Sequence, residues 1–429
     1  MGSNWSIVRV GDLTDSISET HKFEKDYLIF LNTSDVLLGK LLHNLYSEVK
    51  NWPGQAKKSI KKDDILFSEI RPANGRWAYI DFEADDYVVS TKLMVIRTRT
   101  SRVLPKFFYY FLTSSGITWE LQHLAESRSG TFPQITFDQV SELKLSLPPV
   151  PVQRIIVSFL DTLDDKIELN RRMNETLEAM ARSIFNSWFV DFDPVCAKSE
   201  GRNSALPKHI ADLFPASFED TELGEIPKGW KVRPFSTAVE IIGGGTPKTN
   251  VDEYWNGDIP WFSVADAPNE NDVFVIDTKK KINQTGIDHS ATRILPIGTT
   301  IISARGTVGK VALVGVPMTM NQSCYGLQGT GAGPYFTYFA TRQLVVALKQ
   351  RSHGSVFDTI TRDTMAGVAV VVPSRAELNI FEALVAPQME RIRHNLIESR
   401  TLAALRDALL PKLISGELRI NVHLKAESG

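Results

Sequence analysis

Two short glycine-containing segments, residues 71–78 and 305–312, carry the side chains best suited to chemistry in this chain. An arginine can donate two parallel hydrogen bonds to the major-groove edge of guanine, an asparagine can do the same for adenine, and a lysine suits a phosphate. The spacing predicts two turns that present such donors. They are Arg71, Asn74, Arg76, Arg305, Thr307 and Lys310. The alternative is that Arg71 and Arg305 hold their own turns by bonding backbone carbonyls.

Other polar loops add candidates of the same kind. Residues 128–132 and 353–357 form a matched pair of loops rich in glycine and polar side chains, and residues 243–248 contain three glycines in a row. Gln322 lies in a loop of the second half, where the first half has Ser90. The further candidates for nucleic-acid contact are Ser90, Arg128, Thr131, Lys248, Gln322, His353 and Ser355.

No motif in the chain supports catalysis. Residues 304–311 look like a phosphate loop, but Ala304 and Val311 replace the glycine and the serine or threonine that such a loop needs. Residues 243–248 lack the dinucleotide spacing and a following helix, so both stretches are predicted to be tight turns. The chain has no Asn-Pro-Pro-aromatic tetrapeptide for amino-group methylation, no Gly-x-Ser-x-Gly and no His-Glu-x-x-His. We therefore expect a protein that is not an enzyme.

The cysteines and the apolar runs define the expected compartment. Cys196 and Cys324 are far apart and have no paired Cys/His spacing, which predicts neither a disulfide nor a metal site and fits a reducing cytoplasm. No apolar run approaches the roughly 18–20 residues of a membrane span, and the polar N-terminus lacks a signal-peptide core. A cytoplasmic protein without a membrane partner is expected.

Positive charge is concentrated in a few places, although the formal net charge is −2. Lysines cluster at residues 57–62 and 279–281 and arginines at residues 97–102, whereas the long helical segments contain many acids. The negative net charge argues mildly against nucleic-acid binding. Basic faces on the blocks are compatible with local phosphate contact, and the alternative is that they are solvated surface.

The elements that must position these turns follow an internal repeat. Residues 152–189 and 377–414 are two copies of one helical pattern, offset by 225 residues, with apolar steps of four and three. This period predicts a seam for another helix, and two matching seams predict that the copies pair with each other. Asn170 and Asn395 share a seam position, where a polar residue costs stability but fixes register. The predicted inter-helix and docking residues are Ile156, Leu160, Leu163, Ile167, Asn170, Leu177, Ile184, Val385, Ile392, Asn395, Leu402 and Leu409.

The order of the segments favours antiparallel pairing of the two helices. The second block then begins near the far end of the first helix, and a pseudo-twofold axis relates the two halves. Pro387 stands in the second copy where the first has Thr162. It either kinks that helix or lies in the first turn of its main segment.

Each helical copy follows a block of mixed secondary structure. Short β-branched and aromatic runs predict strands in residues 1–148 and 229–373, with a helix in each block at about residues 105–123 and 334–350. Matched positions near the block ends keep the offset of 225, whereas the arginine turns are 234 apart. Residues 190–228 are predicted to be a linker with at most one short helix. These patterns predict an α+β protein. The ends of its two blocks are equivalent under the repeat, whereas the interiors of the blocks differ.

Residues 147–194 carry the most specific resemblance to a known family. Leu147-Pro-Pro-Val-Pro-Val-Gln153, Leu169-Asn-Arg-Arg-Met-Asn-Glu-Thr-Leu177 and Ile184-Phe-Asn-Ser-Trp-Phe-Val-Asp-Phe-Asp-Pro194 resemble the central conserved region of Type I restriction-modification specificity subunits. Leu409-Leu-Pro-Lys-Leu-Ile-Ser-Gly-Glu-Leu418 resembles their distal conserved region. The resemblance covers nearly the whole chain. Because the family's motifs do not fix base-reading positions, the candidates above depend on local chemistry alone.

The resemblance implies a fold with two α/β target-recognition domains separated by two long antiparallel coiled-coil helices, related by a pseudo-twofold internal repeat. The implied parts are recognition domain 1 at 1–148, a central helical region at 149–195, a linker with recognition domain 2 at 196–373, a distal helical region at 374–420 and a tail at 421–429.

The resemblance also implies a function and partners. Each domain would read one half of a bipartite double-stranded DNA site, while the coiled coil sets the spacing and docks two methyltransferase subunits. Restriction/translocase subunits would join this core. S-adenosylmethionine, ATP and Mg²⁺ are expected on the partner subunits and none of them in this chain. The main rival is a non-catalytic coiled-coil adaptor whose terminal domains bind proteins or glycans.

Overall fold

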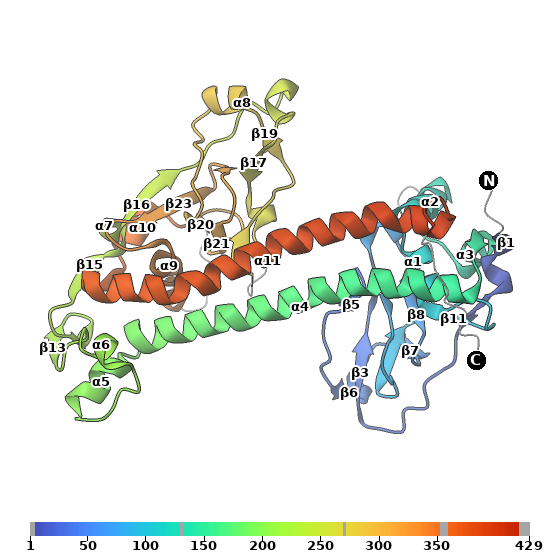
Figure 1. The fold of residues 1–429 in the computed structure, drawn as a ribbon, viewed down its shortest axis with the longest axis horizontal. Coiled ribbons are helices and arrows are strands. Elements are labelled where there is room, and N and C mark those ends of the chain that lie inside the picture. The colour runs from blue at the N-terminus through green and yellow to red at the C-terminus, as the bar shows by residue number, and fades with distance from the viewer. Residues whose placement is uncertain (1–4, 129–131, 269–271, 352–358, 420–429) are drawn as a thin grey trace, which may run out of the picture. The chain divides into compact units, whose positions relative to one another are not determined.

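The computed structural model describes residues 5–128, 132–268, 272–351 and 359–419 (Figure 1). The chain divides into two compact units, residues 1–166 with 401–429 and residues 167–400. Each unit contains one block of mixed structure and part of each of two long helices, α4 (Val150–Phe189) and α11 (Arg375–Ser415). This architecture confirms the predicted fold class.

The first unit is built on two four-stranded sheets and three helices. One sheet has the order β2 (Thr14–Ile17), β11 (Leu93–Thr98), β8 (Ile65–Ser68), β9 (Trp77–Tyr79), and the other β6 (Ser47–Glu48), β3 (Tyr27–Leu31), β10 (Tyr87–Ser90), β7 (Ala56–Ser59). Strands β4 (Val36–Leu37) and β5 (Lys40–Leu41) pair separately, and the helices are α1 (Pro105–Leu112), α2 (Ser115–Arg128) and α3 (Phe137–Glu142).

Strand β8 separates two hydrophobic cores of this unit. Ile65 and Phe67 pack with Phe107 of α1 on one face, while Leu66 packs with Leu31 on the other. Alternate residues of a strand point to opposite faces, so the continuous apolar run predicted as a strand is buried on both sides. The end of β8 is thereby fixed, and the segment from Arg71 begins there.

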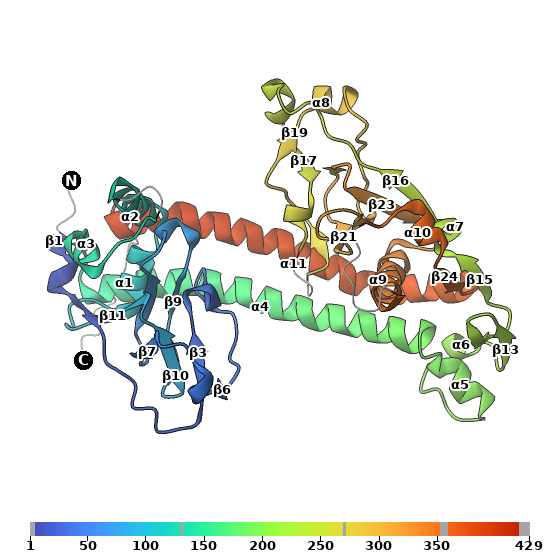
Figure 2. The ribbon, with the colours of Figure 1, turned by 180° about the vertical axis from the view of Figure 1, so that it is seen from behind.

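The second unit repeats this plan with a different interior. Its five-stranded sheet has the order β16 (Val239–Gly243), β23 (Cys324–Gly329), β20 (Thr300–Ser303), β21 (Val311–Val314), β18 (Phe274–Val275). A smaller sheet has the order β19 (Lys281–Ile282), β17 (Ile259–Phe262), β22 (Thr319–Met320). The helices of this block are α7 (Phe235–Ala238), α8 (Gln284–Asp288), α9 (Pro334–Arg351) and α10 (Arg362–Ala366). Figures 1 and 2 both show α9 alongside the first half of α11.

Each block begins and ends with a strand, and in both blocks these two strands pair with each other. β1 (Ser6–Arg9) pairs antiparallel with β12 (Lys144–Leu147), and β15 (Lys231–Pro234) pairs antiparallel with β24 (Ala369–Val372). Ser6 lies opposite Leu147, and Lys231 lies opposite Val372, so both strands and their register keep the offset of 225. Thr136 and Thr361 form capping boxes at α3 and α10 with the same offset. The predicted internal repeat is therefore present in three dimensions.

The two long helices run antiparallel within each unit. In the second unit, Asn174 meets Asn395, and Phe185, further along α4, meets Phe381, which comes earlier in α11. In the first unit, Ile156 and Leu160 share a core with Leu410 and Leu413. Antiparallel pairing was predicted from chain order and is confirmed.

Two sequence-based expectations were wrong, and one of the two alternatives for Pro387 is excluded. The helix expected at residues 105–123 is two helices, because it breaks at Thr113 and Ser114, whose hydroxyls bond the carbonyls of Tyr109 and Phe111 and compete with the helical ladder. The expected linker at 190–228 contains two helices, α5 (Asp193–Ser199) and α6 (Lys208–Ala211), and a hairpin of β13 (Phe218–Thr221) and β14 (Gly224–Pro227). Pro387 lies exposed in the interior of a continuous α11 and not in a first turn.

Candidate nucleic-acid interface

The arginine turn of the first unit connects β8 to β9. Arg71 has φ 45° and ψ 75°, a left-handed conformation that non-glycine residues rarely adopt. Its amide donates to the carbonyl of Pro133 at 3.1 Å, which holds the strained backbone in place. Its exposed side chain makes no hydrogen bond or ion pair with the residues that the structure describes. Asn74 is also exposed, so both donors remain available to a ligand.

Arg76 plays a different part in the same turn. Its Nη1 donates to the carbonyl oxygens of Ser34 at 2.9 Å and Val36 at 3.1 Å. This guanidinium is the carbonyl-bonding arginine that the sequence analysis considered as the alternative for Arg71. Arg76 therefore ties the turn to Ser34 and to the start of β4.

The second arginine turn follows β20 and is held from within. The hydroxyl of Ser303 donates to the carbonyl of Thr307 at 2.6 Å and accepts from the amide of Lys310 at 2.8 Å. Gly306 and Gly309 have φ of 77° and 83°, as a tight turn requires. Arg305 is exposed, and its side chain has no partner among the described residues. Arg71 and Arg305 thus occupy equivalent turns, and neither guanidinium has a partner among the described residues.

The remaining predicted contacts fall into three groups. Ser90 is fully buried and accepts from the amide of Lys92, so we remove it from the candidates. Gln322 accepts a hydrogen bond from Thr246, and Lys248 is exposed. The side chain of Arg128, at the end of α2, and the residues Thr131, His353 and Ser355 lie outside the described part of the chain.

A cavity of about 480 Å³ lies beside the second arginine turn. Its walls are residues 307–311, α9 and the C-terminal half of α4. Four cationic side chains line it: Arg182, Lys310, Arg342 and Lys349. The buried carboxylate of Glu178 lies 2.5 Å from Arg342 and 3.6 Å from Arg182. Burial raises the pKa of Tyr338 to about 12, so this phenol adds no negative charge near neutral pH. The cavity is therefore net positive.

The first unit has a corresponding cavity of about 260 Å³ with a different charge. Asp407 and Leu410 line it, and they stand 225 residues after Arg182 and Phe185 of the second cavity. Here the cation is Arg406, whose Nη1 lies 2.6 Å from Asp164. One guanidinium faces two carboxylates, so the repeat conserves the cavity and reverses its charge balance.

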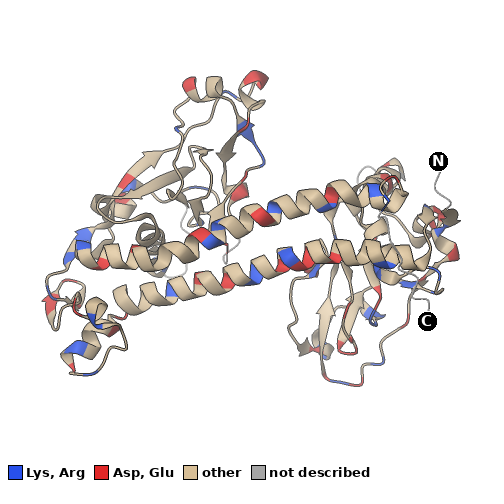
Figure 3. Cartoon of the chain, in the orientation of Figure 1, with Lys and Arg blue, Asp and Glu red and all other residues tan. Residues whose placement is uncertain are grey.

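The basic clusters predicted for phosphate contact are only partly available. Lys58 is buried, donates to the carbonyl of Leu93 at 2.9 Å, and has a pKa lowered by its burial. Arg97 makes two hydrogen bonds to the buried Asp64, at 2.6 and 2.8 Å. Lys57, Lys61 and Lys62 are exposed. Figure 3 also shows both charge signs interleaved along α4 and α11, so the helices are not the acidic surface that the sequence suggested.

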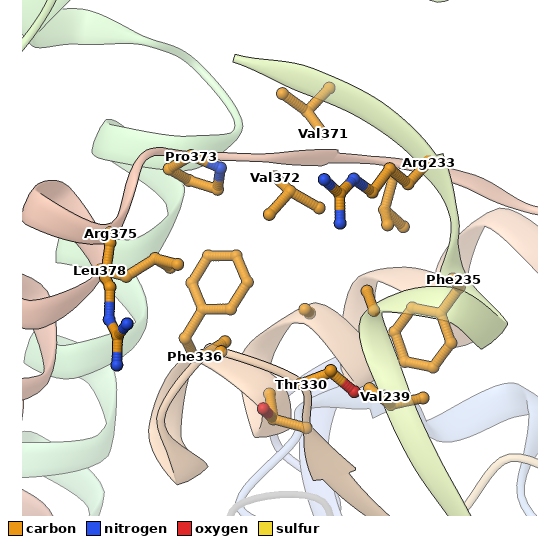
Figure 4. A pocket seen from close by; sticks show the side chains of 16 residues that line it. Arg233, Phe235, Val239, Thr330, Phe336, Val371, Val372, Pro373, Arg375 and Leu378 are labelled. Atoms are coloured by element: carbon orange, nitrogen blue, oxygen red, sulfur yellow. The ribbon is translucent and has the colours of Figure 1, made fainter.

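A third cavity, of about 220 Å³, lies between the β15–β24 pair, α9 and the start of α11 (Figure 4). Phe336 and Leu378 point into it, and Arg233 and Arg375 are the charged residues that line it. Its other walls are mostly Val, Ala and Phe side chains. An apolar interior does not suit a base or a phosphate, so this cavity is not part of the candidate interface.

The predicted seam residues are all buried or half-buried. Six of them are buried: Ile156, Leu160, Leu163, Val385, Ile392 and Asn395. Asn170 is fully buried as well. The other five are half-buried: Ile167, Leu177, Ile184, Leu402 and Leu409.

Helix α2 carries an exposed aromatic pair that was not predicted from the sequence. Trp119 and His123 are four residues apart, and their rings stack in parallel with centroids 5.5 Å apart. The only signal in the sequence was this spacing within a predicted helix. Trp188 and Trp230 are buried.

The described residues provide neither a metal site nor a membrane-spanning helix. They contain no group of three or more His, Cys, Asp or Glu side chains placed to hold a metal ion. None of their helices combines the length and the apolar character needed to cross a membrane.

Comparison with known proteins gives consistent matches along the chain. The family model for the Type I restriction modification DNA specificity domain matches residues 2–179 and 227–386. The chain is 35% identical to the Type I restriction enzyme HindI specificity subunit of Haemophilus influenzae, over 97% of this chain and 100% of that protein. It is 32% identical to the MjaIX specificity subunit of Methanocaldococcus jannaschii, over 38% of this chain and 39% of that one.

A solved structure has the same fold. The S subunit of a Type I restriction-modification system from M. genitalium aligns with 96% of each chain, with a TM-score of 0.54 and 16% identity. At this identity the likeness concerns the fold alone.

Proposed function

Because the chain belongs to the family of Type I restriction modification DNA specificity domains, we propose that it is the DNA-recognition subunit of a Type I restriction-modification complex. Each block would read one half of a bipartite double-stranded site. We assign the recognition domains to residues 1–148 and 196–373 and the helical regions to 149–195 and 374–420. The comparisons do not favour the rival adaptor for proteins or glycans.

The observation that carries this proposal is the pair of free arginines on equivalent turns. Arg71 and Arg305 each follow a strand buried in its unit's core, and neither guanidinium is used by the described protein. A rigid strand end that presents an unpaired bidentate donor suits direct reading of guanine in the major groove. Asn74 would read a neighbouring base, and Thr307 and Lys310 would contact bases or phosphates.

The positive cavity of the second unit supports a phosphate contact there. Lys310 belongs both to the arginine turn and to the cavity wall, and Arg182 of α4 lines the same cavity. A DNA strand read by Arg305 would therefore pass close to these cations. Phosphate contacts set the pose of a protein on DNA without reading sequence, and they weaken steeply with salt.

Within each unit, one side of the helix pair packs against the block, and the opposite side carries exposed apolar residues. Asp164, Glu178 and Glu382 lie on the first side, where they bond Tyr110, Arg342 and the backbone amide of Phe336. Four exposed apolar residues lie on the opposite side, each one residue before a seam position from which the next step is three residues. They are Phe159, Met180, Leu384 and Leu405.

These four residues form two equivalent patches. Leu384 and Leu405 stand 225 residues after Phe159 and Met180. In an antiparallel helix pair, the residues that precede this seam position lie on the same side of both helices. Phe159 therefore lies on the same side as Leu405 in the first unit, and Met180 lies on the same side as Leu384 in the second. Two equivalent apolar patches fit two copies of one partner. We assign them to two methyltransferase subunits, and restriction/translocase subunits would join that core.

The division of labour leaves chemistry to the partners. The methyltransferase would flip the target base and carry S-adenosylmethionine, and ATP and Mg²⁺ would serve the other subunits. This chain would contribute the half-sites and the gap between them, with the helix pair as the spacer.

The deciding experiment is co-expression of the chain with its cognate methyltransferase, followed by genome-wide mapping of methylated bases. The expected result is one bipartite motif that disappears when this chain is omitted. A map with no motif that depends on this chain, together with duplex binding that does not weaken with salt, would contradict the proposal. The matched variants Arg71→Ala and Arg305→Ala show which half of the motif each block reads.

A further inference from the structure

Helix α2 exposes an indole that the fold does not use. Trp119 is 69% exposed, whereas the other seven tryptophans are buried or half-buried. The opposite face of α2 is buried through Leu121 and Ala125. The helix is therefore anchored without any contribution from Trp119.

The indole is preorganised by its neighbour on the helix. The rings of Trp119 and His123 are inclined by only 2°, with centroids 5.5 Å apart. Residues four apart share one face of a helix, so the two rings form a double-width platform on the surface. A stacked pair loses less rotamer freedom on binding than two separate flexible side chains would.

The platform adjoins the Arg71 turn. Gln122 lies on the same face of α2, and its Oε1 accepts from the amide of Ala73 at 3.1 Å. The Nε2 of Gln122 donates to Glu126 at 2.7 Å, which fixes the orientation of this amide. A ligand that reaches Arg71 and Asn74 therefore also meets the face that carries Trp119.

Helix α9 of the second unit carries no such pair. The last eight residues of α9, Leu344–Arg351, contain no tryptophan and no histidine. The Trp119–His123 stack is thus not one of the features that the two blocks share. It belongs to the part of the first block that differs from the second block. Features that differ between the blocks are those expected to distinguish their ligands.

We propose that the Trp119–His123 stack is a second DNA-contacting element of the first recognition domain. It would make apolar contact with base edges and sugars next to the bases read from the Arg71 turn. Glu126 lies on the same face, and its carboxylate would repel a phosphate, so the contact is with bases and sugars. This inference rests on the proposed function, because it takes the Arg71 turn to face DNA.

The test uses the complex with the cognate methyltransferase and a duplex that carries the mapped motif. Trp119→Ala is expected to weaken specific binding about 10- to 100-fold, because aromatic contacts to bases have this size. Trp119→Phe should retain most of the affinity. The salt dependence of binding should not change, because the contact is apolar. The methylation map should relax only in the half-site that Arg71→Ala also affects.

Leu124→Ala is the matched control, since Leu124 is exposed on a different face of the same helix. It should bind as the unmodified protein does. His123→Ala is a second variant that removes the stacking partner, and it should weaken binding less than Trp119→Ala.

Three outcomes would overturn the inference, and they have different meanings. If Trp119→Ala and His123→Ala bind normally while Arg71→Ala does not, the stack is not a DNA contact and the proposed function stands. If Arg71→Ala and Arg305→Ala also bind normally, the proposed reading of DNA by these turns fails. If Trp119→Ala lowers the amount of methyltransferase that co-purifies without DNA, the stack is a protein interface.

Discussion

Asn395 donates a hydrogen bond from its Nδ2 to Oδ1 of Asn174 at 2.8 Å, between α11 and α4. Both side chains are buried. The equivalent pair under the repeat is Asn170 and Ser399, where Nδ2 of Asn170 lies 3.2 Å from the hydroxyl of Ser399. The helix pair therefore contains two equivalent polar layers, which can form in only one register.

Asn395→Ala should destabilise the helix pair by about 1–3 kcal/mol, because Asn174 keeps a buried acceptor without its donor. The midpoint of urea unfolding, followed by circular dichroism, measures this change. The double variant Asn174→Leu, Asn395→Leu should be close to the unmodified protein in stability, because both polar groups are then absent. A double variant as unstable as the single one would refute this account of the layer.

Arg71→Ala and Arg305→Ala should each relax the methylation motif in one half-site only, and not the same half. Each should weaken specific duplex binding by about 1–3 kcal/mol, the size of a bidentate base contact. Neither should lower the thermal unfolding midpoint, since both side chains are exposed and unpartnered among the described residues.

Arg76→Ala is the contrasting variant of the same turn. It should lower the thermal midpoint of the first unit, because the carbonyls of Ser34 and Val36 lose their shared donor. Loss of motif specificity without any loss of stability would show instead that Arg76 contacts DNA.

Replacing Phe159 and Leu405 by aspartate should remove one of the two methyltransferases, because a charge in an apolar interface is costly. Replacing Met180 and Leu384 should remove the other. Native mass spectrometry of the purified complex counts the subunits. Leu223→Asp, at an exposed apolar position in the turn between β13 and β14, should leave both subunits bound. Full occupancy in both double variants would reject these patches as docking sites.

Duplicating residues 171–177 and 396–402 adds one heptad at equivalent places in both helices. Seven helical residues add about 10 Å, close to three base pairs of DNA. The methylation map should keep both half-sites and show a longer gap between them. An unchanged gap would refute the role of the helices as a spacer.

Exchanging residues 1–148 for the same block of a related chain should alter one half-site and leave the other intact. The terminal strands β1 and β12 keep their register with α4 in such an exchange, since their positions are constant in the repeat. Changes in both half-sites would show that the blocks do not read independently.

The helix pair and the terminal strands of the blocks were predictable, because the spacing of apolar residues and the constant offset can be read from the sequence without knowledge of tertiary contacts. A seam with steps of four and three is visible in one dimension, and so are Trp5 and Trp230 or Pro148 and Pro373 at a constant offset. The apolar run at β8 was equally clear, because a strand buried on both faces has few polar residues.

The details of the turns depend on contacts between distant residues. Arg71 and Arg76 are five residues apart in one turn, yet only Arg76 bonds carbonyls, and these belong to residues some 40 positions away. The mostly polar segment at 190–228 also contains Val195, Ile210 and Phe214, and these three residues complete the core around Phe189. Ser90 was chosen as a loop hydroxyl, but the strand buries it.

The two polar layers also bear on the origin of the chain. Asn170 and Asn174 of α4 contact Ser399 and Asn395 of α11, and each contact maps onto the other when the two copies are interchanged. In an isologous dimer of two identical copies, a polar layer would therefore recur at each of these two places. The chain has the architecture of such a dimer fused into one polypeptide. Fusion frees the two blocks to diverge, so one protein can specify an asymmetric site while its ancestral symmetry persists in the seam.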